Sequence, residues 1–174
     1  MLVIVALIVL LLMLAVLLSL LITFLWGAPW SPTPMKTVRR MLEMADLKEG
    51  ERIYDLGSGD GRIAITAYRE FGARPTGVEI NPFLHLLATI RGKAQGCGRN
   101  VDLVCGNLLD VDLSDADVVA AYLSPWGNRK LKEKLERELR RGTRVVTHKW
   151  KFDGWKPVKV DEEHGIWVYE SGRW

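Results

Sequence analysis

The segment Arg52-Ile-Tyr-Asp-Leu-Gly-Ser-Gly-Asp-Gly-Arg62 decides the fold of this 174-residue chain. Residues 52–56 predict a strand, with Ile53 and Leu56 as its apolar positions, and residues 62–71 predict a helix. Between them, glycines stand at every second position. Glycine adopts positive φ freely and leaves room for a ligand beside the backbone. The segment therefore predicts a strand, a tight turn and a helix whose N-terminal amides face a polar or charged ligand.

Acidic residues around this turn narrow the choice of ligand. The glycine spacing is G-x-G-x-G, whereas a dinucleotide-binding turn has G-x-G-x-x-G. Asp55 and Asp60 would repel a pyrophosphate and would favour a ligand that carries a cationic group. The next predicted strand, 76–80, carries Glu79 at its end, and a carboxylate there can accept hydrogen bonds from both hydroxyls of a ribose. A cationic group together with a ribose points to S-adenosylmethionine as the cofactor.

Three short motifs carry a resemblance to a known family. They are Pro32-Thr-Pro34, Asp55-Leu-Gly-Ser-Gly-Asp-Gly-Arg62 and Glu79-Ile-Asn-Pro82. Together they resemble the class I S-adenosylmethionine-dependent methyltransferases, in particular the small archaeal protein-lysine N-methyltransferases. They are also similar to the membrane-anchored mitochondrial relatives that methylate lysines of the ATP synthase c-subunit and the adenine nucleotide translocase. The resemblance covers roughly Pro29 to the C-terminus and implies a seven-stranded methyltransferase sheet.

The resemblance also implies a role for each residue around the turn. Gly57 and Gly59 would line the methionine part of the cofactor, and Asp55 would hold its amino group. Asn107 stands where many class I enzymes have an aspartate that accepts the adenine amine, and its side-chain carbonyl can accept the same bond. The predicted cofactor-binding residues are Thr33, Asp55, Gly57, Gly59, Asp60, Glu79, Asn107 and Leu108.

The methyl acceptor is expected where the fourth strand ends. Class I enzymes place the acceptor beyond that strand, which here ends in Tyr122-Leu-Ser-Pro-Trp126. An aromatic slot would favour a lysine amine, because desolvation lowers the pKa of an ammonium and aromatic faces attract methylated ammonium groups. Trp150 and Trp155 are further candidates for this slot, although both also suit a core position. The predicted catalytic residues are Tyr122, Ser124, Pro125 and Trp126.

Other acceptors and functions compete with this prediction. Enzymes that methylate nucleobase amines carry [DNS]-P-P-[YFW] after the fourth strand, and Ser124-Pro125-Trp126 is one proline short of it. The net charge of +3 and the lack of a long basic run give no sign of a nucleic-acid partner. The three histidines are too scattered to predict a metal site. Two alternatives stay open: a methyltransferase for a membrane lipid or quinone, and a regulator that binds S-adenosylmethionine without turnover.

The first 26 residues predict a transmembrane helix. No charged residue occurs from Leu2 to Trp26, and a helix of about 20 apolar residues crosses a bilayer. Trp26 and Trp30 would lie at the membrane interface. Basic residues follow this segment and none precedes it, which predicts a cytoplasmic catalytic domain, or by family analogy a mitochondrial inner-membrane location in a eukaryote. The basic residues are Lys36, Arg39 and Arg40.

The rest of the chain predicts one α/β domain. Residues 27–34 form a proline-rich linker, and residues 35–174 form the class I methyltransferase domain. Thr33 and Pro34 suit the N-cap and first position of a helix that runs to about Asp46. Alternating strands and helices predict a doubly wound, Rossmann-like sheet of seven strands. The predicted strands are 52–56, 76–80, 102–105, 117–123, 143–149, 156–160 and 166–170, and the later helices are 62–71, 82–95 and 128–141.

Overall fold

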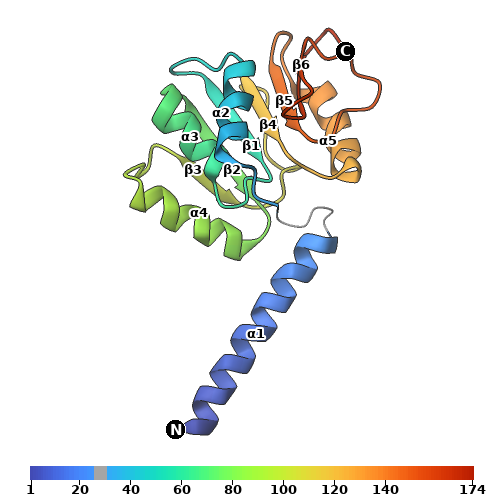
Figure 1. The fold of residues 1–174 in the computed structure, drawn as a ribbon. Helices are drawn as coiled ribbons and strands as arrows, with labels where there is room; N and C mark the ends of the chain where they lie inside the picture. Colours follow the sequence, from blue (N-terminus) through green and yellow to red (C-terminus); the bar gives the residue numbers. More distant parts are fainter. Residues whose placement is uncertain (26–30) are drawn as a thin grey trace.

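A computed structural model describes the backbone of residues 1–25 and 31–174, and the side chains of residues 1–14, 17 and 31–174. It contains a seven-stranded sheet with helices packed on both faces (Figure 1). The strands are β1 (Arg52–Leu56), β2 (Arg74–Glu79), β3 (Asp102–Cys105), β4 (Val118–Ala121), β5 (Arg144–His148), β6 (Lys159–Asp161) and β7 (Ile166–Glu170). The helices are α1 (Leu2–Leu25), α2 (Met35–Met44), α3 (Arg62–Phe71), α4 (Pro82–Ala94) and α5 (Pro125–Glu138).

The strands follow the order β3-β2-β1-β4-β5-β7-β6. Strands β1 to β5 are parallel, and β7 lies antiparallel between β5 and β6. From β1, the strands β2 and β3 are added on one side of the sheet, and the chain then crosses to the other side of β1 to add β4 and the later strands. The strand order therefore reverses between β1 and β4, which makes this position the switch point of the sheet. Open α/β sheets bind their ligands beyond the carboxyl ends of the strands at this point. The seven-stranded sheet predicted from the sequence is confirmed.

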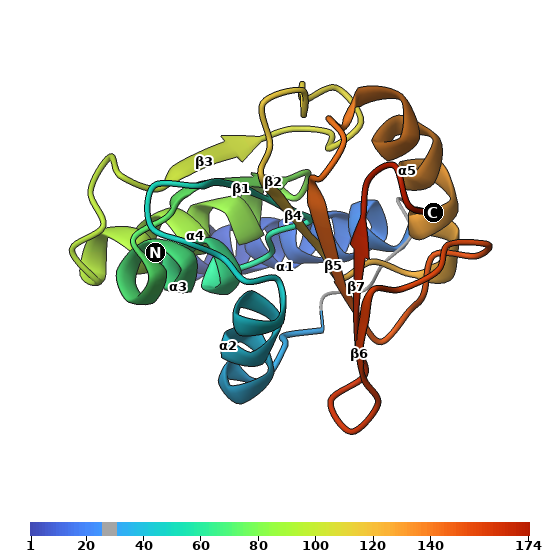
Figure 2. The ribbon, with the colours of Figure 1, turned by 90° about the horizontal axis from the view of Figure 1, so that it is seen from above.

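Two apolar cores enclose the sheet, one on each face. Strand β4 shows the division, because Val118 and Ala120 belong to the core under α2 and α3, whereas Val119 and Ala121 belong to the core under α5. Alternate residues of a strand point to opposite faces. A strand that is covered on both faces is therefore a continuous apolar run. Figure 2 shows α2, α3 and α4 on one side of the sheet and α5 on the other.

The prediction of a transmembrane anchor over residues 1–26 is wrong for the part of the chain that the structure describes. Within those residues, no helix is both long and apolar enough to span a bilayer. A crossing requires about 20 consecutive apolar residues. The structure therefore supports neither the predicted single-pass location nor the cytoplasmic orientation derived from it. The predicted interfacial positions of Trp26 and Trp30, and linker residues 27–30, lie outside the described residues.

The start of α2 differs from the prediction. The helix begins after Pro34, which occupies the N-cap position without a side-chain capping bond, so Thr33 is not the N-cap. Instead Thr33 is buried, and its carbonyl oxygen accepts a hydrogen bond from Arg62 Nη1 at 2.6 Å. This bond joins the segment before α2 to the first residue of α3. The segment is therefore held over the glycine turn by a tertiary contact, which local sequence rules do not describe.

Candidate functional site

One pocket lies beyond the carboxyl ends of β1, β2, β3 and β4, at the switch point of the sheet. It spans about 1150 Å³ of space, including its open mouth. All eight residues predicted to bind the cofactor line this pocket, and so do two of the four predicted catalytic residues. These lining residues are Thr33, Asp55, Gly57, Gly59, Asp60, Glu79, Asn107, Leu108, Tyr122 and Trp126.

The glycine turn is fixed by backbone bonds between neighbouring strand ends. Gly57 N and Ser58 N both donate to the carbonyl oxygen of Val78, at 2.9 and 3.0 Å. Gly57 has a φ of +82°, and a Cβ added there would lie 2.8 Å from Leu123 Cδ2. A side chain at this position would therefore be strained and would clash with the residue that follows β4. Position 57 therefore requires glycine, both for its positive φ and because Leu123 approaches the backbone closely there.

Glu79 connects the end of β2 to this turn. Its side chain is 6% exposed, and Oε2 accepts from Gly59 N at 2.8 Å while Oε1 accepts from Asn81 N at 2.8 Å. Burial raises the pKa of this carboxyl, and the backbone hydrogen bonds partly oppose that shift. Each carboxylate oxygen has a second lone pair, so Glu79 can still accept from a ligand hydroxyl. The residue therefore both shapes the turn and offers acceptors toward the pocket.

Asp55 is the most strongly perturbed acid of the pocket. It is 2% exposed, and its Oδ2 accepts only a long bond, 3.3 Å, from Ala64 N. Burial raises its pKa to about 7, and the nearby negative charges of Glu79 and Asp60 add to the shift. A cationic ligand group beside Asp55 would favour the ionised carboxylate and lower this pKa again. The pocket is therefore suited to the ammonium of an amino-acid moiety.

This shift makes the affinity for an ammonium-bearing ligand depend on pH. We expect the affinity for S-adenosylhomocysteine to fall by up to about tenfold per pH unit below pH 7 and to level off above it, because the ligand binds the ionised form of Asp55. Calorimetry between about pH 5.5 and 8.5, in buffers of different ionisation enthalpy, should show proton release on binding below pH 7. Asp55→Asn should bind more weakly at pH 8 and lose this dependence. A pH-independent affinity of the unaltered protein would contradict the assignment.

Asp60 is engaged within the protein. Its carboxylate forms ion pairs with Arg62 and Arg91, and Oδ1 accepts from Arg62 Nε at 2.8 Å. Burial alone would raise the pKa of Asp60, but the two arginines outweigh it and hold that pKa below its ordinary value. The sequence predicts that Asp60 pairs with a cationic group of the ligand, but the two arginines already neutralise its charge. Asp55 is the acid that remains to pair with such a group. Arg91 was missed because it lies on α4, 31 positions along the chain.

The turn after β3 lines another side of the pocket, where the sequence predicts contacts to adenine. Asn107 Oδ1 accepts from Leu109 N at 3.1 Å, so the acceptor predicted for an adenine amine also stabilises this turn and keeps a second lone pair. Ser58 Oγ is buried in the pocket lining without a hydrogen-bond partner among the described residues. A polar ligand or an ordered water would satisfy it. Together with the carboxylates of Glu79 and Asp55, this unpaired hydroxyl fits a nucleoside that carries an amino acid.

Two aromatic residues line the pocket after β4, where the sequence predicts the methyl acceptor. Tyr122 follows β4, and its ring meets His148 edge-on at 4.7 Å between centroids. Trp126 lies in the first turn of α5 and is 41% exposed. Lys130 Nζ stands 3.6 Å from the centre of the Trp126 ring, and Lys130 also lines the pocket. The open face of Trp126 thus already holds an ammonium group at the pocket mouth, as an aromatic face does by cation–π attraction.

The other two predicted catalytic residues do not line the pocket. Ser124 is the N-cap of α5, where its Oγ accepts from Gly127 N at 3.1 Å, and Pro125 is the first helical residue. This cap starts α5 three residues earlier than the predicted 128. The cap places Trp126 at the pocket mouth. Ser124 and Pro125 therefore position Trp126 and do not line the pocket themselves.

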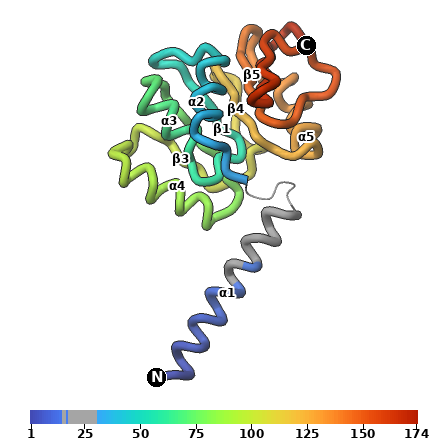
Figure 3. The backbone as a smooth tube through the Cα atoms, in the orientation of Figure 1, coloured from blue at the N-terminus to red at the C-terminus, as the bar shows by residue number. Residues whose placement is uncertain are grey.

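Neither Trp150 nor Trp155 contributes to this pocket. Trp155 is buried and stacks on Phe152 and on Trp174, with 3.9 Å between the ring centroids of the two tryptophans. The chain end, marked C in Figure 3, lies beside α5 in the view of Figure 2. Trp150 is exposed and lines a second recess on the far side of the α5 N-terminus. The aromatic slot is therefore limited to Tyr122 and Trp126 among these candidates.

Comparison with known proteins agrees with this geometry. The ANTKMT methyltransferase domain matches residues 55–159. The chain is 42% identical over 151 residues to the protein-lysine N-methyltransferase of Saccharolobus islandicus, a match that covers 83% of this chain and 94% of that protein. It is 34% identical over 145 residues to the adenine nucleotide translocase lysine N-methyltransferase of Mus musculus, covering 82% of this chain. The match spans 62% of the length of the mouse protein.

A solved structure extends the comparison to the pocket. The RNA methyltransferase from Salinibacter ruber, crystallised with S-adenosyl-L-homocysteine, is 45% identical in sequence and superimposes with a TM-score of 0.76. The match covers 81% of this chain and 92% of the solved one. Fold, pocket and sequence agree, and the matched domain covers more than half of the chain. The chain therefore belongs to the ANTKMT methyltransferase family and is an S-adenosylmethionine-dependent methyltransferase.

Proposed function

We propose that the protein transfers the methyl group of S-adenosylmethionine to the side-chain amine of lysine residues in proteins. The observation that carries this proposal is the ammonium of Lys130, 3.6 Å from the centre of the Trp126 ring at the mouth of the cofactor pocket. An aromatic face that attracts one lysine ammonium can attract a substrate lysine or its methylated product. The names of the archaeal and mouse relatives, both lysine N-methyltransferases, support the same acceptor.

The residues of the pocket would act by holding and orienting the reactants. When bound, the cofactor supplies a methyl group on a positively charged sulfur. Glu79 would accept the ribose hydroxyls and Asp55 the amino group, which fixes the direction of the methyl group. Fixed orientation of two reactants is worth several kcal/mol, up to about 7–11 in model reactions. Tyr122 and Trp126 would surround the acceptor, and desolvation there would favour the neutral amine that has the lone pair for attack.

The proposal also specifies the class of protein that is methylated. The mouse relative is named for the adenine nucleotide translocase, and we extend that observation to protein substrates that are associated with membranes. A comparison of lysine masses in membrane and soluble fractions, from cells with and without the gene, tests this extension. Methyl-lysine that disappears only from the soluble fraction would contradict it.

The reaction itself is tested by mass spectrometry of a protein extract from cells that lack the gene. The extract is incubated with the purified full chain and methyl-labelled cofactor. We expect lysine residues to gain methyl groups and S-adenosylhomocysteine to form in equal amount. Trp126→Ala should lower kcat/KM about two- to fivefold, since Trp126 is exposed and a cation–π contact at an exposed site is worth about 0.5–1 kcal/mol. Cofactor affinity should change less than twofold, and Trp126→Phe should keep most of the activity.

One specific observation favours a second candidate, methylation of RNA. The 45% identical solved structure is titled an RNA methyltransferase. Total RNA and a lipid extract are therefore incubated in parallel with the protein extract. Label that appears in RNA or lipid and not on lysine would replace the protein-lysine proposal. Cofactor binding without any S-adenosylhomocysteine formation would contradict methyl transfer altogether.

A further inference from the structure

We infer that a second recess, beside the methyl-transfer pocket, binds an acidic segment of the protein substrate next to the acceptor lysine. This inference rests on the proposed protein-lysine activity. The recess encloses about 690 Å³ between the N-terminal turns of α5 and the loop that follows β5. We call it the basic recess, and its defining residues are Asn128, Arg129, Lys132, Lys149, Trp150 and Lys151.

The residues that line the basic recess carry mainly positive charge. Four cationic side chains line it, and Asp153 is the one carboxylate among its lining residues. Lys132 Nζ donates to the backbone carbonyl of Asp153 at 2.6 Å. Within the part of the chain that the structure describes, no carboxylate lies within 4 Å of the charged groups of Arg129, Lys149 or Lys151. Lys151 Nζ lies 5.2 Å from the centre of the Trp167 ring, which leaves its positive charge in place. Three exposed cations without a carboxylate partner among the described residues form a surface that favours an anionic ligand.

The backbone of the recess is held in a fixed shape. Lys149 has a φ of +68°, a left-handed conformation that is uncommon outside glycine. The loop is nevertheless secured, because Lys149 N donates to Gly165 O at 2.7 Å and Thr147 Oγ1 donates to Trp150 O at 2.9 Å. Asn128 Nδ2 donates to the carbonyls of Trp150 and Lys151, at 3.0 and 3.3 Å. The cationic side chains therefore extend from a preformed loop, which lowers the entropy cost of binding.

A second feature of the recess favours a peptide as its ligand. Asn128 is 2% exposed, and its Oδ1 is buried without a hydrogen-bond partner among the described residues. An unsatisfied buried acceptor costs free energy unless a ligand supplies a donor. The N–H of a peptide backbone is such a donor, whereas a phosphate group at neutral pH offers mainly acceptors. A peptide with acidic side chains would satisfy both Asn128 and the surrounding cations.

The basic recess is close enough to the methyl-transfer pocket for one substrate segment to reach both. Trp126 lines the pocket and Arg129 lines the recess, on successive turns of α5. Three residues of helix span about 4.5 Å, and an extended peptide advances about 3.3 Å per residue. Acidic side chains roughly one or two positions from the acceptor lysine would therefore lie over the recess. The recess would select lysines in an acidic sequence context.

The test compares two lysine peptides that differ only in having glutamate or glutamine at these flanking positions. We expect the unaltered protein to methylate the glutamate peptide with at least about tenfold higher kcat/KM, mainly through KM, and this preference should shrink at high salt. The variant Arg129→Glu/Lys149→Glu/Lys151→Glu should lose the preference while its rate on the glutamine peptide and its cofactor affinity stay within twofold. The matched control Lys93→Glu/Arg99→Glu/Arg74→Glu changes the same charge at exposed positions and should keep the preference.

A binding experiment distinguishes a failure of this inference from a failure of the proposed reaction. Fluorescence anisotropy measures binding of a labelled acidic peptide without lysine and of a labelled RNA oligonucleotide. If neither lysine peptide is methylated but the acidic peptide binds and the triple variant does not bind it, the reaction is misassigned and the basic recess stands. Equal rates on both lysine peptides, or RNA binding that is tighter than peptide binding and lost in the triple variant, would overturn the acidic-peptide assignment.

Discussion

Gly59→Arg is expected to abolish cofactor binding, with a loss of at least about 100-fold, or 2.7 kcal/mol, in the affinity for S-adenosylhomocysteine. Gly59 lines the pocket, has a φ of +55°, and donates its N–H to Glu79 Oε2. An arginine side chain at this position would occupy the space of the ligand and bring a positive charge toward a cationic cofactor. Isothermal titration calorimetry measures the loss directly.

The chain offers a matched control for this substitution. Gly96 also has a positive φ, +73°, and a Cβ added there would meet no atom within 4 Å. Gly96→Arg should therefore show the same backbone cost, roughly 1–2 kcal/mol of unfolding free energy, with unchanged cofactor affinity. If both variants bind the cofactor equally well, the glycine turn is not the cofactor site. If both lose binding equally, the effect comes from stability and not from the pocket.

Glu79→Ala is expected to produce the second large effect, on both stability and binding. The carboxylate accepts from two buried backbone N–H groups, of Gly59 and Asn81. Hydrogen bonds to charged groups contribute about 1.5–3 kcal/mol each, so the loss of these two bonds should lower the free energy of unfolding by about 3–6 kcal/mol. The loss of the proposed ribose contacts should weaken S-adenosylhomocysteine binding by about 100-fold. Thermal unfolding and calorimetry measure the two effects separately.

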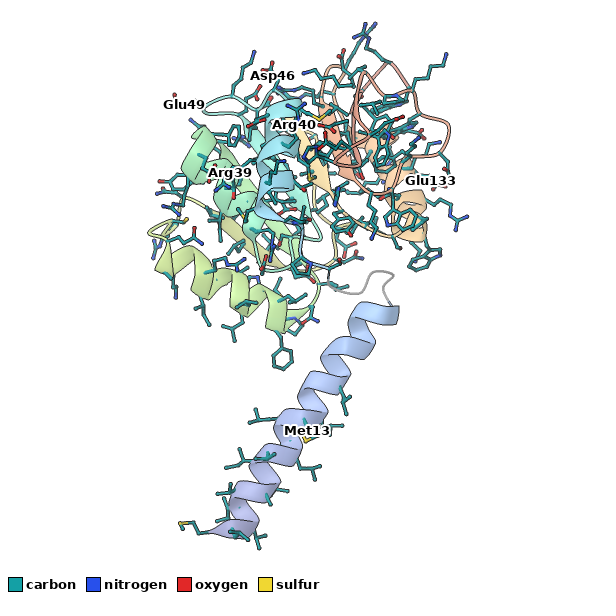
Figure 4. All side chains as sticks on the ribbon, in the orientation of Figure 1. Met13, Arg39, Arg40, Asp46, Glu49 and Glu133 are labelled. Carbon is teal, nitrogen blue, oxygen red and sulfur yellow. The ribbon has the colours of Figure 1, made fainter. Side chains whose placement is uncertain are left out.

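Two further variants identify what the carboxylate of Glu79 contributes. Glu79→Gln keeps one acceptor oxygen and should restore part of the stability but little of the affinity. Glu133→Ala alters an exposed glutamate on α5 (Figure 4) and should change the unfolding free energy by less than about 0.5 kcal/mol. Reduced stability of Glu79→Ala with unchanged cofactor affinity would mean that Glu79 only supports the turn. The ribose contact would then have to be assigned to another residue.

Local patterns were sufficient to predict the sheet and the cofactor side of the pocket. A strand, alternate glycines and a helix specify a backbone conformation over a few residues, and Glu79 follows at the end of the next strand. In parallel strands the carboxyl ends meet at one edge, so strand order alone brings Asp55, Glu79 and Asn107 together. The start of α2 was mispredicted by one residue, because the first helical bond runs from Val38 N to Pro34 O, while Thr33 is held by Arg62, 29 positions away.

The predicted anchor shows a different limit. An apolar run suggests a membrane-spanning helix by composition, but within the described residues no helix meets the requirements of length and apolarity. The predicted catalytic set was also too broad, because Ser124-Pro125 suits a helix start as well as an acceptor site. In the structure these residues cap α5, and the side chains that reach the pocket mouth are Tyr122 and Trp126.

The parallel sheet, the glycine turn and the acids around the cofactor pocket could be predicted from the sequence, because these features depend on backbone conformation and strand order. The use of the charges could not, because it depends on contacts between distant elements. The tertiary structure neutralises Asp60 with Arg91, leaves Asp55 buried with a raised pKa, and sets Lys130 over Trp126. The physical reason is that ion pairing and desolvation depend on distances of a few ångström between side chains on different elements, and packing alone fixes those distances.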